Sequence, residues 1–135
     1  MRQLIALAAL VATAACSSDT STTEPLVGSL AGSYSLRTLN GTTLPFTLVS
    51  HDTTVQLDTD VILMTDGGEW NEVVNYRQTV GTTATTNESF MLSGVWTRSG
   101  NNVSFRVQNG VLYLGTATDS SLNLSDNFYN YVFVR

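Results

Sequence analysis

Apolar and polar residues alternate along most of the chain from Gly32 to its end, and no window keeps the spacing of an amphipathic helix. The alternation is clearest where Val103, Phe105 and Val107 are separated by single polar residues. A period of two places successive side chains on opposite faces of a β-strand. The pattern therefore predicts an all-β domain over residues 32–135.

Turn-forming residues divide this domain into segments of strand length. The expected strands are 33–39, 44–50, 54–64, 69–80, 88–98, 103–107, 111–118 and 127–134, with a further short strand over 122–124. Asn40-Gly41 and Asn109-Gly110 are dipeptides preferred in two-residue hairpin turns. About eight strands joined by short turns favour a small antiparallel up-and-down β-barrel, which has no free edges. Two stacked sheets are the alternative, but hairpin turns outnumber long crossovers.

Two aspartates lie in the middle of the expected strand 54–64. Its apolar residues at odd-numbered positions between Val55 and Leu63 share one face, which places Asp58 and Asp60 on the other. Two carboxylates can attract a cation, but calcium needs six to eight oxygen ligands. We therefore expect both aspartates to point to solvent, where they discourage pairing between sheets.

Residues 1–15 have the organisation of an export signal. A positive start is followed by an apolar run over 4–12 and by small residues before Cys16, the single cysteine of the chain. The apolar run is too short for a membrane-spanning helix, which needs about 20 residues. The position of Cys16 resembles the lipobox of bacterial lipoproteins, in which the cysteine is acylated and becomes the mature N-terminus. The alternative is ordinary cleavage after Ala14 or Ala15, which leaves a free thiol.

The segment 16–31 is expected to be a flexible tether. Its Ser- and Thr-rich part, 17–25, cannot bury apolar surface. Acyl chains such as palmitate on Cys16 would hold the protein on the lipid bilayer. Ser17 does not resemble the aspartate that retains bacterial lipoproteins at the inner membrane. We therefore expect a protein anchored in the bacterial cell envelope, at the outer rather than the inner membrane.

The charge of the chain argues against some partners. It contains no lysine, and removal of Arg2 with the signal leaves 5 basic and 11 acidic residues, a net charge of 5 − 11 = −6. An acidic chain without a basic cluster is a poor candidate for binding nucleic acid. It is an equally poor candidate for electrostatic docking to anionic lipid headgroups.

The start of the first expected strand, Gly32-Ser33-Tyr34, resembles the Gly-x-Trp motif of lipocalins, with tyrosine in place of tryptophan. In that family an arginine late in the barrel packs across the aromatic ring, and Arg135 stands at the corresponding place. The spacing of expected strands and turns over 32–135 is similar to that of small bacterial lipocalin-like (calycin-type) lipoproteins. The resemblance implies a barrel that is open at one end and has an apolar ligand site.

Aromatic residues are the most suggestive candidates for such a site. A barrel of eight strands is just wide enough to be filled by side chains or to hold one small ligand. The candidates for pocket or core are Tyr34, Trp70, Tyr76, Phe90, Trp96 and Phe105. The last strand is apolar on both faces, which indicates contact with a protein partner or a second copy at Tyr129, Tyr131 and Phe133.

No catalytic constellation is visible in the sequence. His51 is the only histidine, and its neighbour Asp52 would point to the opposite face of a strand. The run 66–69 lacks the spacing of a phosphate loop and reads as a hairpin turn. Because the inward positions read as almost wholly apolar, we expect no enzyme, metal or cofactor.

These observations predict a lipid-anchored envelope protein whose barrel binds a small apolar ligand without catalysis. The alternative is a structural or protein-interaction module of the envelope, with a filled core and no small-molecule ligand.

Overall fold

The computed structural model describes residues 29–107, 110 and 112–135. The expected signal peptide, Cys16 and most of the tether lie outside these residues. All regular secondary structure in the described part is β-strand. No helix there is long and apolar enough to cross a membrane.

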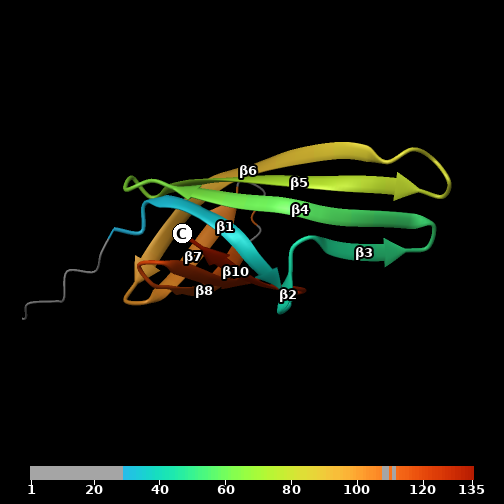
Figure 1. Cartoon of the computed structure of the whole chain (residues 1–135). Coiled ribbons are helices and arrows are strands. Elements are labelled where there is room, and N and C mark those ends of the chain that lie inside the picture. The colour runs from blue at the N-terminus through green and yellow to red at the C-terminus, as the bar shows by residue number, and fades with distance from the viewer. Residues whose placement is uncertain (1–28, 108–109, 111) are drawn as a thin grey trace, which may run out of the picture.

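The strands form one antiparallel sheet that closes into a barrel (Figure 1). From β4 to β10 each strand pairs with the next along the chain, and β1 pairs with β10 on one side and with β4 on the other. Eight strands thus form the closed ring, with β2 and β3 added outside it. The predicted all-β up-and-down barrel is confirmed. The strands are β1 (Gly32–Leu39), β2 (Thr42–Thr43), β3 (Phe46–Ser50), β4 (Thr53–Met64), β5 (Glu69–Val80), β6 (Thr86–Ser99), β7 (Asn102–Val107), β8 (Leu112–Ala117), β9 (Ser121–Ser125) and β10 (Asn130–Val134).

The first hairpin forms at the predicted dipeptide. Asn40 and Gly41 have φ angles of 49° and 79°, and Leu39 pairs with Thr42 across them. Positive φ at both central positions matches the twist of the flanking strands. The side chain of Asn40 also accepts a hydrogen bond of 2.8 Å from the backbone N–H of Asn130, which ties this turn to β10.

A β-bulge in β4 reverses the expected orientation of its second half. The pairing with β5 shifts between Leu57 and Thr59, so Asp58 is an extra residue. After the bulge Asp60 points inward and is 4 % exposed, whereas Leu63 points outward and is 50 % exposed. The expectation that Asp58 and Asp60 share a solvent-facing side was therefore wrong for Asp60, because one inserted residue changes the phase of a strand.

One end of the barrel is filled by side chains. Tyr34, Trp70, Phe105 and Phe133 are at most 1 % exposed and pack with aliphatic residues from the surrounding strands. The rings of Trp70 and Phe105 meet edge to face with their centroids 5.4 Å apart, a geometry that contributes about 0.5–1.5 kcal/mol beyond burial of area. This end carries the packed core of the fold.

The residues before β1 and the last residue of the chain close the filled end. The hydroxyl of Tyr34 donates a hydrogen bond of 2.9 Å to the carbonyl oxygen of Leu30. The guanidinium of Arg135 lies over the Tyr34 ring and donates to the carbonyl oxygens of Ala31 and Asp119. The aromatic–arginine contact that the lipocalin resemblance implied is present.

At the other end of the barrel, the strands on one side extend beyond the closed ring. The first half of β4 pairs with β3 rather than with β1, and β5 and β6 remain paired along the same length. Strands β3 to β6 consequently run on past the closed ring, toward the right in Figure 1. One face of this extension continues the inner surface of the barrel and forms a wall above its mouth.

Candidate functional site

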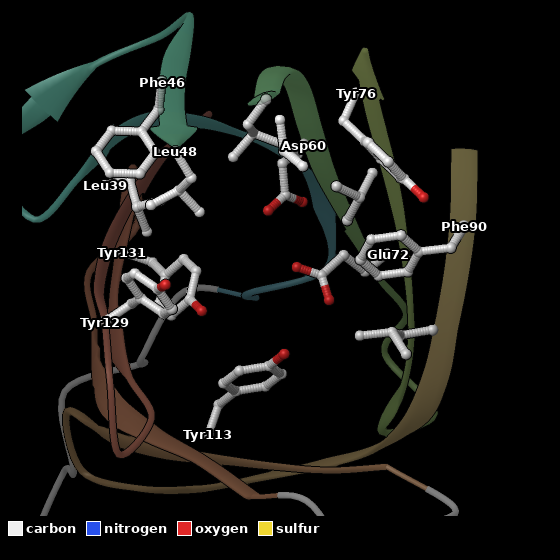
Figure 2. A pocket seen from close by; sticks show the side chains of 14 residues that line it. Leu39, Phe46, Leu48, Asp60, Glu72, Tyr76, Phe90, Tyr113, Tyr129 and Tyr131 are labelled. Atoms are coloured by element: carbon white, nitrogen blue, oxygen red, sulfur yellow. The ribbon is translucent and has the colours of Figure 1, made fainter. Parts of the chain in front are cut away.

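A pocket of about 240 Å³ lies at the mouth of the barrel (Figure 2). It is bounded by the tall wall, by tyrosines from the opposite side and by two carboxyl groups at its floor. The residues that line it are Leu39, Phe46, Leu48, Val55, Leu57, Asp60, Glu72, Val74, Tyr76, Phe90, Leu92, Tyr113, Tyr129 and Tyr131.

The wall presents apolar side chains that the fold leaves partly uncovered. Leu48 on β3 is 42 % exposed and Phe90 on β6 is 45 % exposed. Phe90 packs edge to face against Tyr76 on β5, with ring centroids 6.1 Å apart. Exposed apolar side chains gathered around a concavity are typical of a binding surface.

Tyrosines form the opposite side of the pocket. The centroid of the Tyr131 ring lies 5.9 Å from the centroid of the Tyr113 ring and 6.2 Å from that of the Tyr129 ring. The hydroxyl of Tyr131 donates a hydrogen bond of 2.9 Å to Asp126 Oδ2. Burial raises the pKa values of Tyr113 and Tyr131, so both hydroxyls stay neutral at physiological pH.

Asp60 and Glu72 form the floor. They lie on the neighbouring strands β4 and β5, where Asp60 pairs with Val74 and Glu72 with Ile62, so the two carboxyl groups are diagonal neighbours. Each residue is only 4 % exposed. Figure 2 shows both carboxyl groups turned toward the middle of the pocket, with the hydroxyl of Tyr113 directed toward them from the other side.

The two floor carboxyl groups do not ionise together. Burial raises the pKa of Asp60 from its ordinary 3.8 to about 6. Burial, the charge of Asp60 and the hydrogen bond between the two groups raise the pKa of Glu72 from 4.5 to about 9. At neutral pH the pair therefore retains one proton and carries one negative charge.

The pair is not fully satisfied by the protein. Asp60 Oδ1 and Glu72 Oε2 have no hydrogen-bond partner among the described residues. A half-protonated pair of this kind can accept hydrogen bonds from a donor on a ligand, and it can also give and take a proton. The expectation that inward positions are almost wholly apolar was wrong at these two residues.

Four of the six aromatic candidates lie in or against the filled end rather than the pocket. Tyr34, Trp70 and Phe105 are fully buried in the core. Trp96 packs against this core and donates a hydrogen bond of 3.2 Å from Nε1 to the carbonyl oxygen of Thr65. Their positions show that size and apolarity alone do not distinguish core from pocket along one strand.

The two remaining aromatic candidates lie in the pocket, and the residues proposed as a partner face are divided between the pocket and the core. Tyr76 and Phe90 line the pocket. Of the residues proposed as a partner face, Tyr129 and Tyr131 also line the pocket, while Phe133 is 1 % exposed within the core. The side chains of this set therefore turn to the interior of the barrel, and the outer face of β10 is formed by the residues between them.

Sequence reasoning missed the two floor residues for different reasons. Glu72 falls between Trp70 and Val74 in the alternation of β5, so the period of two already placed it inside. Asp60 had no such signal, because its orientation depends on the bulge at Asp58. An acidic residue in phase with buried apolar neighbours is the feature that would have revealed Glu72.

The other polar candidates lie away from the pocket. His51 is exposed in the turn between β3 and β4, with its Nδ1 3.3 Å from the hydroxyl of Ser50. The segment 66–69 turns between β4 and β5, as expected. Within 29–107, 110 and 112–135, no group of three or more His, Cys, Asp or Glu residues is placed to hold a metal ion.

Comparison with known proteins gives no relative to reason from. No protein-family profile, no curated protein and no solved structure matches the chain significantly.

Proposed function

We propose that this protein is a lipid-anchored envelope lipoprotein whose lipocalin-like barrel binds a small apolar ligand in the pocket at its mouth, without catalysis. The observation that supports ligand binding is the concave apolar wall above the filled core. An apolar cavity of roughly 150 Å³ accepts benzene in other proteins. A volume of about 240 Å³ is larger than such a cavity, and the open mouth lets a ligand of more than one ring extend along the wall.

The anchoring part of this proposal is supported by the sequence. The apolar run over 4–12, the small residues after it and Cys16 follow the order of a lipoprotein signal. The acylated cysteine would keep the barrel close to the outer membrane, where apolar ligands partition. A pocket that opens to solvent suits capture of a molecule from that surface.

The ligand part is tested by titration with N-phenylnaphthylamine, a neutral apolar dye whose fluorescence rises in an apolar site. Phe90→Asp places a charge on the pocket wall, and Met91→Asp places the same charge on the next residue of β6, which is 71 % exposed on the outer side. We expect Phe90→Asp to weaken dye binding by about tenfold or more because the dye would meet a charge in an apolar site. We expect Met91→Asp to bind as the wild type does. Absence of a wild-type signal, or equal loss in both variants, would contradict the proposal.

A protein-interaction module of the envelope is the second candidate. Met91 and Val95, on the outer face of β6, are 71 % and 53 % exposed, and Leu63 on β4 is 50 % exposed. Apolar residues on the outer wall are typical of contact with another protein. This candidate predicts that Met91→Asp disrupts a cross-linked envelope complex and that no variant of the pocket wall changes it.

A further inference from the structure

The floor of the pocket carries a feature that an apolar ligand alone would leave unused. Asp60 Oδ1 and Glu72 Oε2 are buried, line the pocket and have no hydrogen-bond partner among the described residues. Buried acceptors without a donor destabilise a fold, so they indicate a donor that is absent from the chain itself.

No basic side chain of the described residues lines the pocket around this pair, and the whole chain contains no lysine. Arg77 pairs with Asp58 at 2.7 Å, and Arg135 lies over Tyr34 at the filled end. A cationic group on a bound molecule would supply the counter-charge that the ionised member of this pair lacks.

The surroundings of the pair suit an organic cation better than a metal ion. Calcium needs six to eight oxygen ligands, and the pocket offers two carboxyl groups among apolar side chains. On the side opposite the pair, Tyr113 turns its hydroxyl toward the two carboxyl groups, where it can accept a hydrogen bond from an ammonium group (Figure 2). Leu57, on the wall, would cover the apolar part of the same molecule.

We infer that the ligand is a protonated amine on a small apolar or aromatic body, with its ammonium group on Asp60 Oδ1 and Glu72 Oε2 and its body against the wall. This inference rests on the proposed function, since it concerns the same pocket and names the class of molecule held there. It adds a selectivity that apolar contact alone does not provide, because a hydroxyl in place of the ammonium brings no counter-charge and a carboxylate brings a second negative charge.

Three compounds of similar size test the selectivity by displacement of bound N-phenylnaphthylamine from the full-length protein. They are phenethylamine, phenethyl alcohol and hydrocinnamate, which differ in charge at one end. We expect the amine to displace the dye at a concentration about tenfold or more below that of the alcohol, because it forms a charge-assisted hydrogen bond, and the carboxylate to be weakest. In the double variant Asp60→Asn, Glu72→Gln the ratio between the displacing concentrations of the alcohol and the amine should fall to about one.

The outcomes separate this inference from the proposed function. Dye binding without a preference for the amine overturns the inference and leaves the apolar pocket standing. Failure of the dye to bind overturns both. Retention of the amine's advantage in a folded double variant also overturns the inference, because the floor carboxyl groups would then have no part in selectivity.

A pH series on the wild type replaces the double variant if that variant does not fold. Glu72 on β5, Tyr113 on β8 and Tyr131 on β10 line the pocket with Asp60, and Tyr131 donates a hydrogen bond to Asp126 outside it. The tyrosines stay neutral, and Asp60, with a pKa of about 6, takes up a proton as the solution is acidified. The advantage of the amine over the alcohol should therefore fall by about tenfold between roughly pH 7 and pH 5. An unchanged ratio over this range contradicts the inference.

Discussion

The guanidinium carbon of Arg135 lies 5.1 Å from the centroid of the Tyr34 ring, so the last residue of the chain covers the first strand of the barrel. The contact is too close for another side chain to share. A Cβ atom added to Gly32 would stand 2.6 Å from Arg135 Nη2, and the φ of Gly32 is +150°. The position of the Arg135 guanidinium therefore depends on the absence of a side chain at Gly32.

Arg135→Ala is expected to reduce the free energy of unfolding by about 2 kcal/mol, because it removes a cation–π contact and hydrogen bonds to two backbone carbonyl oxygens. Arg37→Ala is the control, since Arg37 is exposed on β1. That substitution should change stability by less than about 0.5 kcal/mol. Urea denaturation of both variants measures the difference. Equal effects would show that the contact of Arg135 with the Tyr34 ring contributes nothing to the free energy of unfolding.

Stability should fall as the pH rises from about 4.5 toward 9, which is the reverse of ordinary acid denaturation. The folded-state pKa values of Asp60 and Glu72, about 6 and about 9, lie above the ordinary 3.8 and 4.5. The folded protein therefore holds more protons than the unfolded chain across this window, and each rise in pH favours unfolding. The total change should amount to a few kcal/mol. Chemical denaturation at a series of pH values measures it.

The double variant Asp60→Asn, Glu72→Gln provides the control for this profile. Its amide groups do not titrate, so its stability should be nearly flat over the same range and should exceed that of the wild type near the alkaline end. Asp58, whose pKa is lowered by its hydrogen bond with Arg77, affects stability only below about 3.8 and lies outside this window. If the stability of the wild type changed as little with pH as that of the variant, this would contradict a proton shared by Asp60 and Glu72.

Gly94→Ala should destabilise the barrel by about 1–3 kcal/mol or more, because a side chain there has no space. A Cβ atom at Gly94 would overlap the carbonyl oxygen of Arg106 on β7 and would stand 3.0 Å from Nε1 of Trp70. The control is Gly67→Ala, where the added atom meets only Thr65 Oγ1 at 3.7 Å. Thermal unfolding of the two variants should differ clearly, and similar melting temperatures would rule out close strand approach as the role of Gly94.

Cys16→Ser should prevent acylation and remove the protein from the outer-membrane fraction, because the thiol that would carry the acyl chains is gone. Incorporation of labelled palmitate and fractionation of a bacterial host measure both effects. Ser17→Asp provides a second variant, which should keep the label and move the protein to the inner membrane. Palmitate incorporation that persists in Cys16→Ser would contradict the proposed anchor.

Local features of the fold were predictable from the sequence. The hairpin at Asn40-Gly41 and the strand over 69–80 depend on turn chemistry and side-chain alternation, which neighbouring residues determine. The last strand begins later than expected, at Asn130. The reason is local but less visible: the side chain of Asp126 accepts hydrogen bonds of 2.7 Å from the backbone N–H groups of Phe128 and Tyr129 and holds them in a turn.

The candidate site was predictable only in part. Tyr76 and Phe90 were identified as aromatic candidates, but which aromatic residues fill the core depends on how far each strand runs past the ring. The length of β4 beyond its contact with β1 is a property of strand pairing and not of local pattern. The inward turn of Asp60 depends on a one-residue insertion relative to β5, which only the paired sheet reveals.

The separation of a filled end from an open end has a consequence for how this protein can diverge. Trp70 and Phe105 supply tight packing far from the mouth, while Leu48 and Phe90 on the wall remain almost half exposed. Substitutions on the wall then alter the shape of the pocket at little risk to folding, because stability is carried elsewhere. Point mutations on the wall would then change which molecules the proposed binding pocket accepts, while the barrel itself stays the same.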